Sequence, residues 1–282
     1  IIDVRLNTNF SDPGVNANDN VDGDISSSIT TSGTVNTSSV GTYIIKYSVL
    51  DTAGNSNSVS RTVNVISIYF ENGACKCPNA TIGDTAVING TTYTVVNNSI
   101  IAGQITNGNY NLCTTLVTNM KELFRNNSSF NSDISFWDTS NVTNMEHIFA
   151  STPFNQNISN WDVSKVVTFE RAFAYSSFNQ PIGSWNISSA TNISGMFRGS
   201  NENNKTVFNQ DISGWNTSKV THFNGMFFYA NSFNQNIGRW NTSNAIYMQA
   251  MFTNASSFNQ DLSGWCVQNI PSEPALPDGG WS

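Results

Sequence analysis

The stretch Met251–Trp265, with the sequence MFTNASSFNQDLSGW, is the clearest copy of a unit that recurs along this chain. Two features mark the unit: a Phe-Asn pair, here Phe258-Asn259, and a tryptophan seven residues after the phenylalanine. Both features occur six times, and successive phenylalanines are 24, 24, 30, 25 and 25 residues apart. A fixed offset repeated this often predicts an array of six stacked repeats. The aromatic pairs are Phe130 and Trp137, Phe154 and Trp161, Phe178 and Trp185, Phe208 and Trp215, Phe233 and Trp240, and Phe258 and Trp265.

A second apolar block precedes each of these phenylalanines. In the first repeat it consists of Val117, Met120, Leu123 and Phe124, at offsets 0, +3, +6 and +7. Such offsets place side chains on one face of a helix, so each repeat is expected to contain about one and a half helical turns. A threonine follows the first apolar residue in four repeats, where its hydroxyl is expected to cap the helix. These threonines are Thr118, Thr143, Thr191 and Thr221.

The twelve aromatic residues of the pairs are predicted to form the core of the array. One short repeat cannot bury its own apolar face, whereas six stacked repeats bury a continuous column. We therefore expect the six tryptophans to fill the core, and not to form an exposed platform for sugars. The asparagine after each phenylalanine is expected to stack into a ladder whose amides bond the backbone of neighbouring repeats. The ladder residues are Asn131, Asn155, Asn179, Asn209, Asn234 and Asn259.

Residues 1–66 have a different pattern, in which short alternating segments such as Val59–Val65 are separated by turn residues. Alternation with period two predicts half-buried strands, and several such strands predict a β-sandwich. The motifs of this segment resemble the bacterial Ig-like domain of adhesins and other secreted proteins. Because the chain begins at Ile1 with little room for an upstream strand, we expect that strand either to have been removed or to come from another chain. The motifs are Asp12-Pro13-Gly14-Val15, Asp19–Ile25, Gly41-Thr42-Tyr43 and Asp51–Asn55.

The repeats resemble those of the BspA-like leucine-rich-repeat surface proteins, in the branch with a Phe-Asn-Gln-Asp-Ile-Ser-x-Trp unit. The resemblance runs from Tyr69 to Trp265 and includes Cys75-Lys76-Cys77-Pro78. It implies surface display and adhesion, and it brings no catalytic residues with it. The expected fold class is therefore mixed: an N-terminal Ig-like β-sandwich followed by an α/β leucine-rich-repeat-like solenoid of six repeats.

Four segments follow from these patterns. Residues 1–66 are expected to be the Ig-like β-sandwich, and 67–116 a β-rich N-terminal cap that contains cysteines. Residues 117–269 are expected to be the six-repeat solenoid, and 270–282 a C-terminal tail. The fourth repeat is longer than the others through Asn201–Thr206. Insertions in repeat arrays map to loops on one face, which is often the binding face.

The four cysteines, Cys75, Cys77, Cys113 and Cys266, are disulfide candidates. An extracellular location favours disulfides. Cys113 is expected to pair with Cys75 or with Cys77, and the sequence leaves both pairings open. Cys266 lies about five repeats away, at roughly 5 Å for each stacked turn, which is too far for an internal bridge.

Few residues indicate metal binding or catalysis. Asp19, Asp22 and Asp24 are candidate calcium ligands because hard cations take several carboxylate oxygens, although aspartates also serve simply as turn formers. No other metal or cofactor is expected. Acidic residues share one repeat position in repeats one, four and six, so no two are neighbours, whereas a glycosidase needs its carboxyl groups within about 5–9.5 Å. We therefore expect no catalytic residues and no enzymatic activity. These acidic residues are Asp133, Asp211 and Asp261.

Composition narrows the function further. The net charge is −7 and only 11% of the residues are charged, so a basic surface for nucleic acid is absent. No apolar run approaches the roughly 20 residues that span a bilayer. We expect an extracellular, cell-surface adhesin whose partner is a glycan or protein on a surface or matrix. The alternative is a structural subunit that binds copies of itself head to tail and forms a filament, by strand donation at the Ig-like domain and contacts at the end of the array.

Overall fold

A computed structural model describes residues 1–200 and 206–270 of the chain. It divides into two compact units. The first unit comprises Ile1–Tyr69 and Cys77–Asp84, and the second comprises Phe70–Lys76 and Thr85–Ser282. The predicted C-terminal tail and most of the insertion in the fourth repeat lie outside the described residues. In the described part of the chain, no helix is both long enough and apolar enough to cross a membrane.

The first unit is built on a four-stranded sheet in the order β1-β6-β5-β4. The two long central strands pair antiparallel over their whole length, whereas β1 runs parallel to β6 at the edge. Along β5, Tyr43, Ile45 and Tyr47 point inward, and the residues between them are exposed, which is the period-two pattern of a half-buried strand. The strands are β1 (Ile2–Arg5), β4 (Thr30–Ser32), β5 (Gly41–Leu50) and β6 (Ser56–Ile66).

The predicted β-sandwich is wrong for this unit, because the described residues contain only one sheet of this size. The other pairing is between β2 (Asn18–Asp19) and β3 (Gly23–Asp24), followed by the 3-10 helix η1 (Ser26–Ser28). The turn residues that separate the expected strands leave these segments too short to form a second layer. One cluster of the core consists of Val4, Ile45, Tyr47 and Val63, against which partly buried side chains from strands and loops pack.

A polar network holds the loop that contains Asp12 against the sheet. The Tyr47 hydroxyl donates to Asp12 Oδ1 over 2.6 Å, and Arg61 Nη1 donates to the Tyr47 hydroxyl over 2.7 Å. Arg61 also pairs with Asp12 and donates from Nη2 to the Gly14 carbonyl over 2.8 Å. The hydrogen bond from Tyr47 lowers the pKa of Asp12, so this carboxylate stays charged. The Asp-Pro-Gly motif is therefore a structural anchor.

Short strands precede the repeats. β9 and β10 form a hairpin whose turn residues, Asn89 and Gly90, both have positive φ, as such two-residue turns require. β10 pairs in parallel with β11, and α1 lies between these two strands in the chain. The elements are β7 (Tyr69–Glu71), β8 (Ala74–Lys76), β9 (Thr85–Ile88), β10 (Thr91–Asn97), α1 (Ile101–Thr106) and β11 (Leu112–Leu116).

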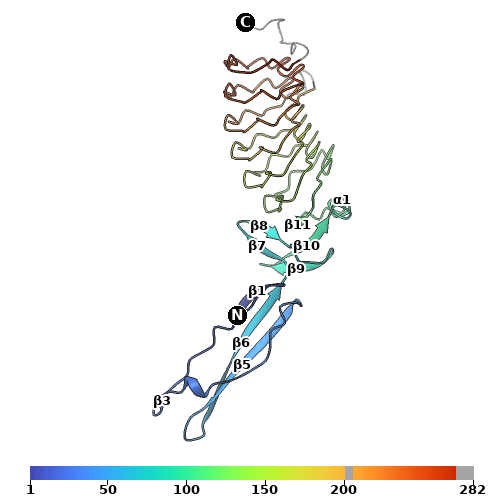
Figure 1. The fold of residues 1–282 in the computed structure, drawn as a ribbon. Coiled ribbons are helices and arrows are strands. Elements are labelled where there is room, and N and C mark those ends of the chain that lie inside the picture. The colour runs from blue at the N-terminus through green and yellow to red at the C-terminus, as the bar shows by residue number, and fades with distance from the viewer. Residues whose placement is uncertain (201–205, 271–282) are drawn as a thin grey trace. The chain divides into compact units, whose positions relative to one another are not determined.

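In the described residues, the repeats stack as successive coils of chain without helices (Figure 1). Parallel β-bridges join one residue of each coil to its equivalent in the next. Alternate backbone N–H groups bond across the coils: in the first repeat, Met120, Glu122 and Phe124 donate to the second. The intervening N–H groups close tight turns within a repeat, as Leu123 does by donating to the Met120 carbonyl. The bridge residues are Asn119, Asn144, Thr168, Asn192, His222 and Tyr247.

The predicted α/β leucine-rich-repeat-like solenoid is therefore wrong, since the described residues contain one short α-helix and it precedes the repeats. The physical reason is a residue with positive φ inside each predicted helix, such as Glu122 (60°), His147 (55°) and Arg171 (50°). A residue in the left-handed region interrupts a right-handed helix. The threonines expected to cap helices instead join neighbouring coils: the Thr143 hydroxyl donates to the Thr118 carbonyl over 3.2 Å.

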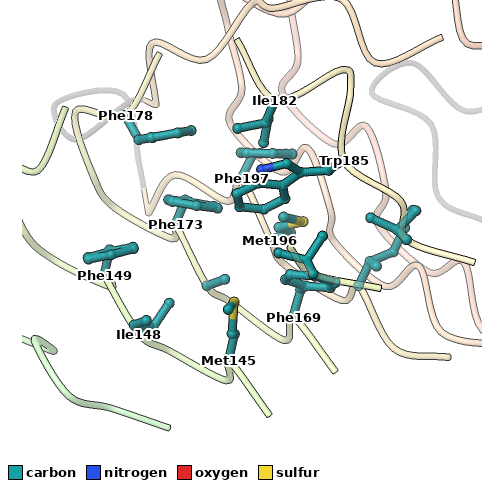
Figure 2. Close-up of a cluster of buried hydrophobic side chains, with 14 of the residues drawn as sticks. Met145, Ile148, Phe149, Phe169, Phe173, Phe178, Ile182, Trp185, Met196 and Phe197 are labelled. Atoms are coloured by element: carbon teal, nitrogen blue, oxygen red, sulfur yellow. The ribbon is translucent and has the colours of Figure 1, made fainter. Parts of the chain in front are cut away.

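The core of the repeats is a stack of aromatic rings. Phe149, Phe173 and Phe197 lie one above another in successive repeats, with ring centroids 5.6 and 5.8 Å apart (Figure 2). Within one repeat, the Phe-Asn phenylalanine packs closer still, as in the 4.1 Å between the centroids of Phe173 and Phe178. Each buried phenyl ring contributes roughly 1.5–3 kcal/mol through burial. The stack therefore links every repeat to the next.

Candidate functional site

The asparagines of the Phe-Asn pairs form a ladder that runs along the repeats. The side-chain oxygen of Asn131 accepts a hydrogen bond from the backbone N–H of Asn155 over 2.9 Å. Each later rung repeats this bond at the same length, up to Asn234 with Asn259. Because these amides hold neighbouring coils together, the ladder is a structural feature of the array.

The tryptophans lie inside the array. All six are buried, with Trp137 1% exposed and Trp265 8% exposed. Each indole N–H from the second repeat onward donates to a carbonyl of the preceding repeat, as Trp185 does to Ile158 over 3.1 Å. The phenylalanines of the pairs are buried as well, apart from Phe258, which is half-buried in the last repeat. A sugar platform made of these rings is therefore excluded.

A hollow lies on the outer surface of repeats three to six, with a volume of about 380 Å³. The hollow lies along the column of bridge residues. Its lining includes the last three of them, Asn192, His222 and Tyr247, where the column changes from small polar to aromatic side chains. Tyr247 is 40% exposed, and its ring lies 4.7 Å from the ring of His222. We call this hollow the repeat groove. It is lined by Glu170, Arg171, Asn192, Ser194, Gly195, Arg198, His222, Asn224, Gly225, Tyr247, Gln249 and Ala250.

Two glycines create the groove. The left-handed position of each repeat carries glutamate, histidine or arginine in repeats one to three, but Gly195 and Gly225 occupy it in repeats four and five. Positive φ alone does not require glycine here, because His147 and Arg171 adopt similar angles. A side chain would also crowd its neighbours: a Cβ on Gly195 would lie 2.9 Å from Cγ of Arg171, and one on Gly225 would lie 3.3 Å from Nη1 of Arg198, the end of a flexible side chain. The glycines therefore make room for two arginine side chains.

These two arginines supply the positive charge of the groove. Among the described residues, no ion pair joins Arg171 or Arg198 to a carboxylate. The guanidinium of Arg198 lies over the ring of Phe228, 4.1 Å from its centroid, which fixes its plane. Its Nε is buried and makes no hydrogen bond with the described residues, whereas most buried polar atoms have partners.

Amide and imidazole groups line the rest of the groove in fixed orientations. Asn192 Nδ2 donates to Glu170 Oε2 over 3.0 Å, and Asn224 Nδ2 donates to Gln249 Oε1 over 2.6 Å. The second oxygen of this pair, Asn224 Oδ1, is buried without a hydrogen bond to the described residues. The Nδ1 atom of His222 lies 2.7 Å from the Thr221 hydroxyl, which orients its ring. The groove thus offers planar polar groups beside an aromatic ring.

The three candidate calcium ligands are not brought together. Asp19 Oδ1 accepts from the backbone of Val21 and Asp22, Asp22 accepts from Thr52, and Asp24 Oδ1 accepts from Ser26. The described residues hold no group of three histidine, cysteine or acidic side chains that could bind a metal. Asp19 and Asp24 therefore stabilise local turns, whereas Asp22 joins its turn to the one that contains Thr52.

The cysteines are divided between the two units. Cys77 is buried in the first unit, Cys75 and Cys113 are buried in the second, and Cys266 is half-buried in the last repeat. Cys75 lies on β8 and Cys113 on β11, and the Thr115 hydroxyl on β11 donates to the Cys75 carbonyl over 3.4 Å. β8 and β11 are therefore neighbours. The pairing of Cys113 with Cys75 or Cys77 stays a prediction.

Sequence reasoning missed the repeat groove. It pointed to the insertion Asn201–Thr206 as a marker of the binding face, and residues 201–205 lie outside the described residues. One signal was present: Gly195 and Gly225 replace large residues at one aligned repeat position. Asp133, Asp211 and Asp261 serve local turns, since each accepts from the N–H two residues later, and this bond to Ser213 lowers the pKa of Asp211.

Comparisons with known proteins agree with a repeat protein of the bacterial surface. Residues 94–207 and 202–275 match the family described as "Mycoplasma protein of unknown function, DUF285". These matches cover more than half of the chain, which therefore belongs to this family. Residues 2–65 match the family described as "Bacterial surface protein, Ig-like domain", which confirms the Ig-like prediction and indicates the cell surface. The leucine-rich-repeat resemblance is not confirmed. No curated protein matches the chain.

Proposed function

We propose that this protein is an extracellular adhesin, without catalytic activity, that binds its partner in the repeat groove. The observation that carries the proposal is the loss of side chains at Gly195 and Gly225. At this position, repeats one to three carry charged or imidazole side chains, whereas repeats four and five open a hollow of about 380 Å³. Ligand sites are concave and carry a few convergent polar groups, and they usually have volumes of about 300–1,000 Å³.

The rigidity of the groove supports binding. Its walls are residues of stacked coils, which backbone hydrogen bonds join on both sides, as in Gly195 N–H to the Asn224 carbonyl over 2.8 Å. The Asn224–Gln249 and Asn192–Glu170 hydrogen bonds fix the polar side chains before a ligand arrives. A preformed site loses less conformational entropy on binding than a flexible one. The bacterial surface Ig-like match agrees with display outside the cell.

Filling the groove tests the proposal. Ala250 lines the groove with φ of 53°, and His147 adopts 55° at the equivalent position, so the backbone accepts histidine there. The variant Ala250→His is expected to fold and to obstruct the groove. Glu122→His places the same side chain at the equivalent position of the first repeat, outside the groove, with φ of 60° in the native residue. It is the matched control.

The purified chain and both variants would be applied to an array of neutral and acidic glycans and to immobilised fibronectin and collagen. We expect the native chain and Glu122→His to bind the same probe, and Ala250→His to bind it at least about tenfold more weakly. The proposal is overturned if the native chain binds none of the probes, or if Ala250→His binds as well as the control. Circular dichroism would verify that the variants keep the native spectrum.

A further inference from the structure

We infer that the repeat groove recognises a sugar ring that carries a carboxylate, such as a uronic acid or a sialic acid. This inference rests on the proposed function, since it names the ligand class of the same site. It is argued from three properties of the groove: its two arginines, its exposed aromatic ring and its fixed amides.

The arginines provide the carboxylate recognition. Their two guanidinium groups outnumber the single carboxylate of the lining, Glu170, so the groove is positive in a chain whose net charge is −7. Glu170 already accepts from Asn192 and forms no ion pair with either arginine among the described residues. A planar guanidinium binds a carboxylate through two parallel hydrogen bonds. The site therefore favours one carboxylate on the ligand.

The other half of the groove suits a sugar ring. Tyr247 lines the groove and is 40% exposed, and the ring of His222, from the neighbouring repeat, lies against it. Aromatic rings present a flat apolar surface with a polar tip, and the apolar face of a pyranose can stack on such a surface. The amides of Asn192 and Asn224 both line the groove, and each Nδ2 keeps a second N–H, in a fixed direction, that can donate to a hydroxyl group.

An acidic peptide fits these features less well. An extended peptide usually gains affinity by adding a strand to a sheet edge. In the groove, the coils already use their backbone groups on each other: Gly225 N–H donates to Gln249, and Gly195 N–H donates to Asn224. Recognition must therefore come from side chains, and a compact ring with hydroxyl groups matches the planar side chains of the lining.

Affinity would be measured by isothermal titration with oligogalacturonate, with its fully methyl-esterified form, with sialyllactose and with lactose. Methyl esters keep the sugar ring and remove the charge, and lactose lacks the acid of sialyllactose. We expect one of the two acidic ligands to bind, and its uncharged counterpart to bind at least about tenfold more weakly, because charge-assisted bonds are lost. Which acid binds distinguishes uronic from sialic acid as the source of the carboxylate.

Variants place the ligand in the groove. Arg171→Gln and Tyr247→Ala are each expected to weaken acid binding at least about tenfold, whereas Arg239→Gln, an exposed arginine outside the groove, leaves it unchanged. Arg198→Lys keeps the charge but loses the planar fork, so it is also expected to weaken binding. Thermal melts identify a variant that fails to fold. If Arg198→Lys fails to fold, Tyr247→Ala still tests the groove, because its side chain is substantially exposed.

Three results would overturn the inference. One is equal binding of the acidic ligands and their uncharged counterparts, and another is no binding of either acid. The third is tight binding of polyglutamate, which would make the ligand an acidic peptide. Each of these leaves the proposed function standing if Ala250→His still abolishes binding of another probe, so the two failures are distinguishable.

Discussion

Phe173 occupies the middle of the aromatic stack, and its truncation tests whether that stack holds the repeats together. The ring is 1% exposed and lies within 6.1 Å, centroid to centroid, of four other rings. Replacing a buried phenylalanine by alanine costs about 3–5 kcal/mol, because burial is lost and a cavity remains. The rings on both sides are held in place by their own repeats, so the cavity is poorly refilled. We expect Phe173→Ala to destabilise the chain by about 4 kcal/mol.

Two other variants calibrate this value. Phe258→Ala removes a half-buried ring from the last repeat, where, among the described residues, it stacks on Phe233 and Phe252, and we expect roughly half the cost. Val167→Ala trims a side chain that is 43% exposed and is expected to change stability by less than about 0.5 kcal/mol.

Urea unfolding followed by tryptophan fluorescence measures all three variants, because six of the seven tryptophans lie in the repeats. The order of the three losses matters more than their absolute size, since stability in a repeat array is a sum of local terms. A loss below about 1 kcal/mol for Phe173→Ala would refute the reasoning. An equal loss of stability for Phe258→Ala would also refute it, because the contribution of a ring would then not depend on having neighbouring rings on both sides.

Two further predictions concern the ladder and the effect of pH. Asn179→Ala removes the side-chain oxygen that accepts hydrogen bonds from the N–H of Asn209 and from Gln210. We expect it to lower the free energy of unfolding in urea by about 1–3 kcal/mol. Asn236→Ala is the control and should have a smaller effect, because the Asn236 oxygen accepts from Gly238 in a local turn. Burial, and then the nearby arginines, lower the pKa of His147, so the unfolded chain binds a proton more readily than the folded one. Stability should therefore fall as the pH drops below about 6.5, and His147→Asn should flatten that fall in melting temperature between about pH 7 and pH 5. A native profile as flat as that of the variant would contradict this assignment.

Much of the repeat architecture is already visible in the sequence. The register of the repeats follows from Phe and Trp at a constant offset, and the residues at these positions are the ones that the structure buries. Burial can be predicted from the sequence because every repeat packs its apolar side chains against similar neighbouring repeats, so equivalent positions are buried in each. The asparagine ladder follows for the same reason, since equivalent residues lie one above another in a stack.

The conformation of each coil was decided by contacts that the sequence does not display. Offsets of 0, +3, +6 and +7 fit one face of a helix, and they also fit a chain that turns tightly through left-handed residues such as Glu122 and His147. Hydrogen bonds to the next coil, about 25 residues away, stabilise the tightly turning conformation rather than the helix. Similarly, the turn-rich segments of the first unit alternate in places, yet they pair too briefly to build a second sheet.

The sequence by itself determined the number of repeats, their register and their core. Only the tertiary structure decided that the described coils lack helices and that Arg198, His222 and Tyr247, from three successive repeats, meet around one hollow. The physical reason is distance along the chain. Burial in a repeat depends on residues a few positions apart, whereas a groove depends on side chains from different coils that become neighbours only when the coils have stacked.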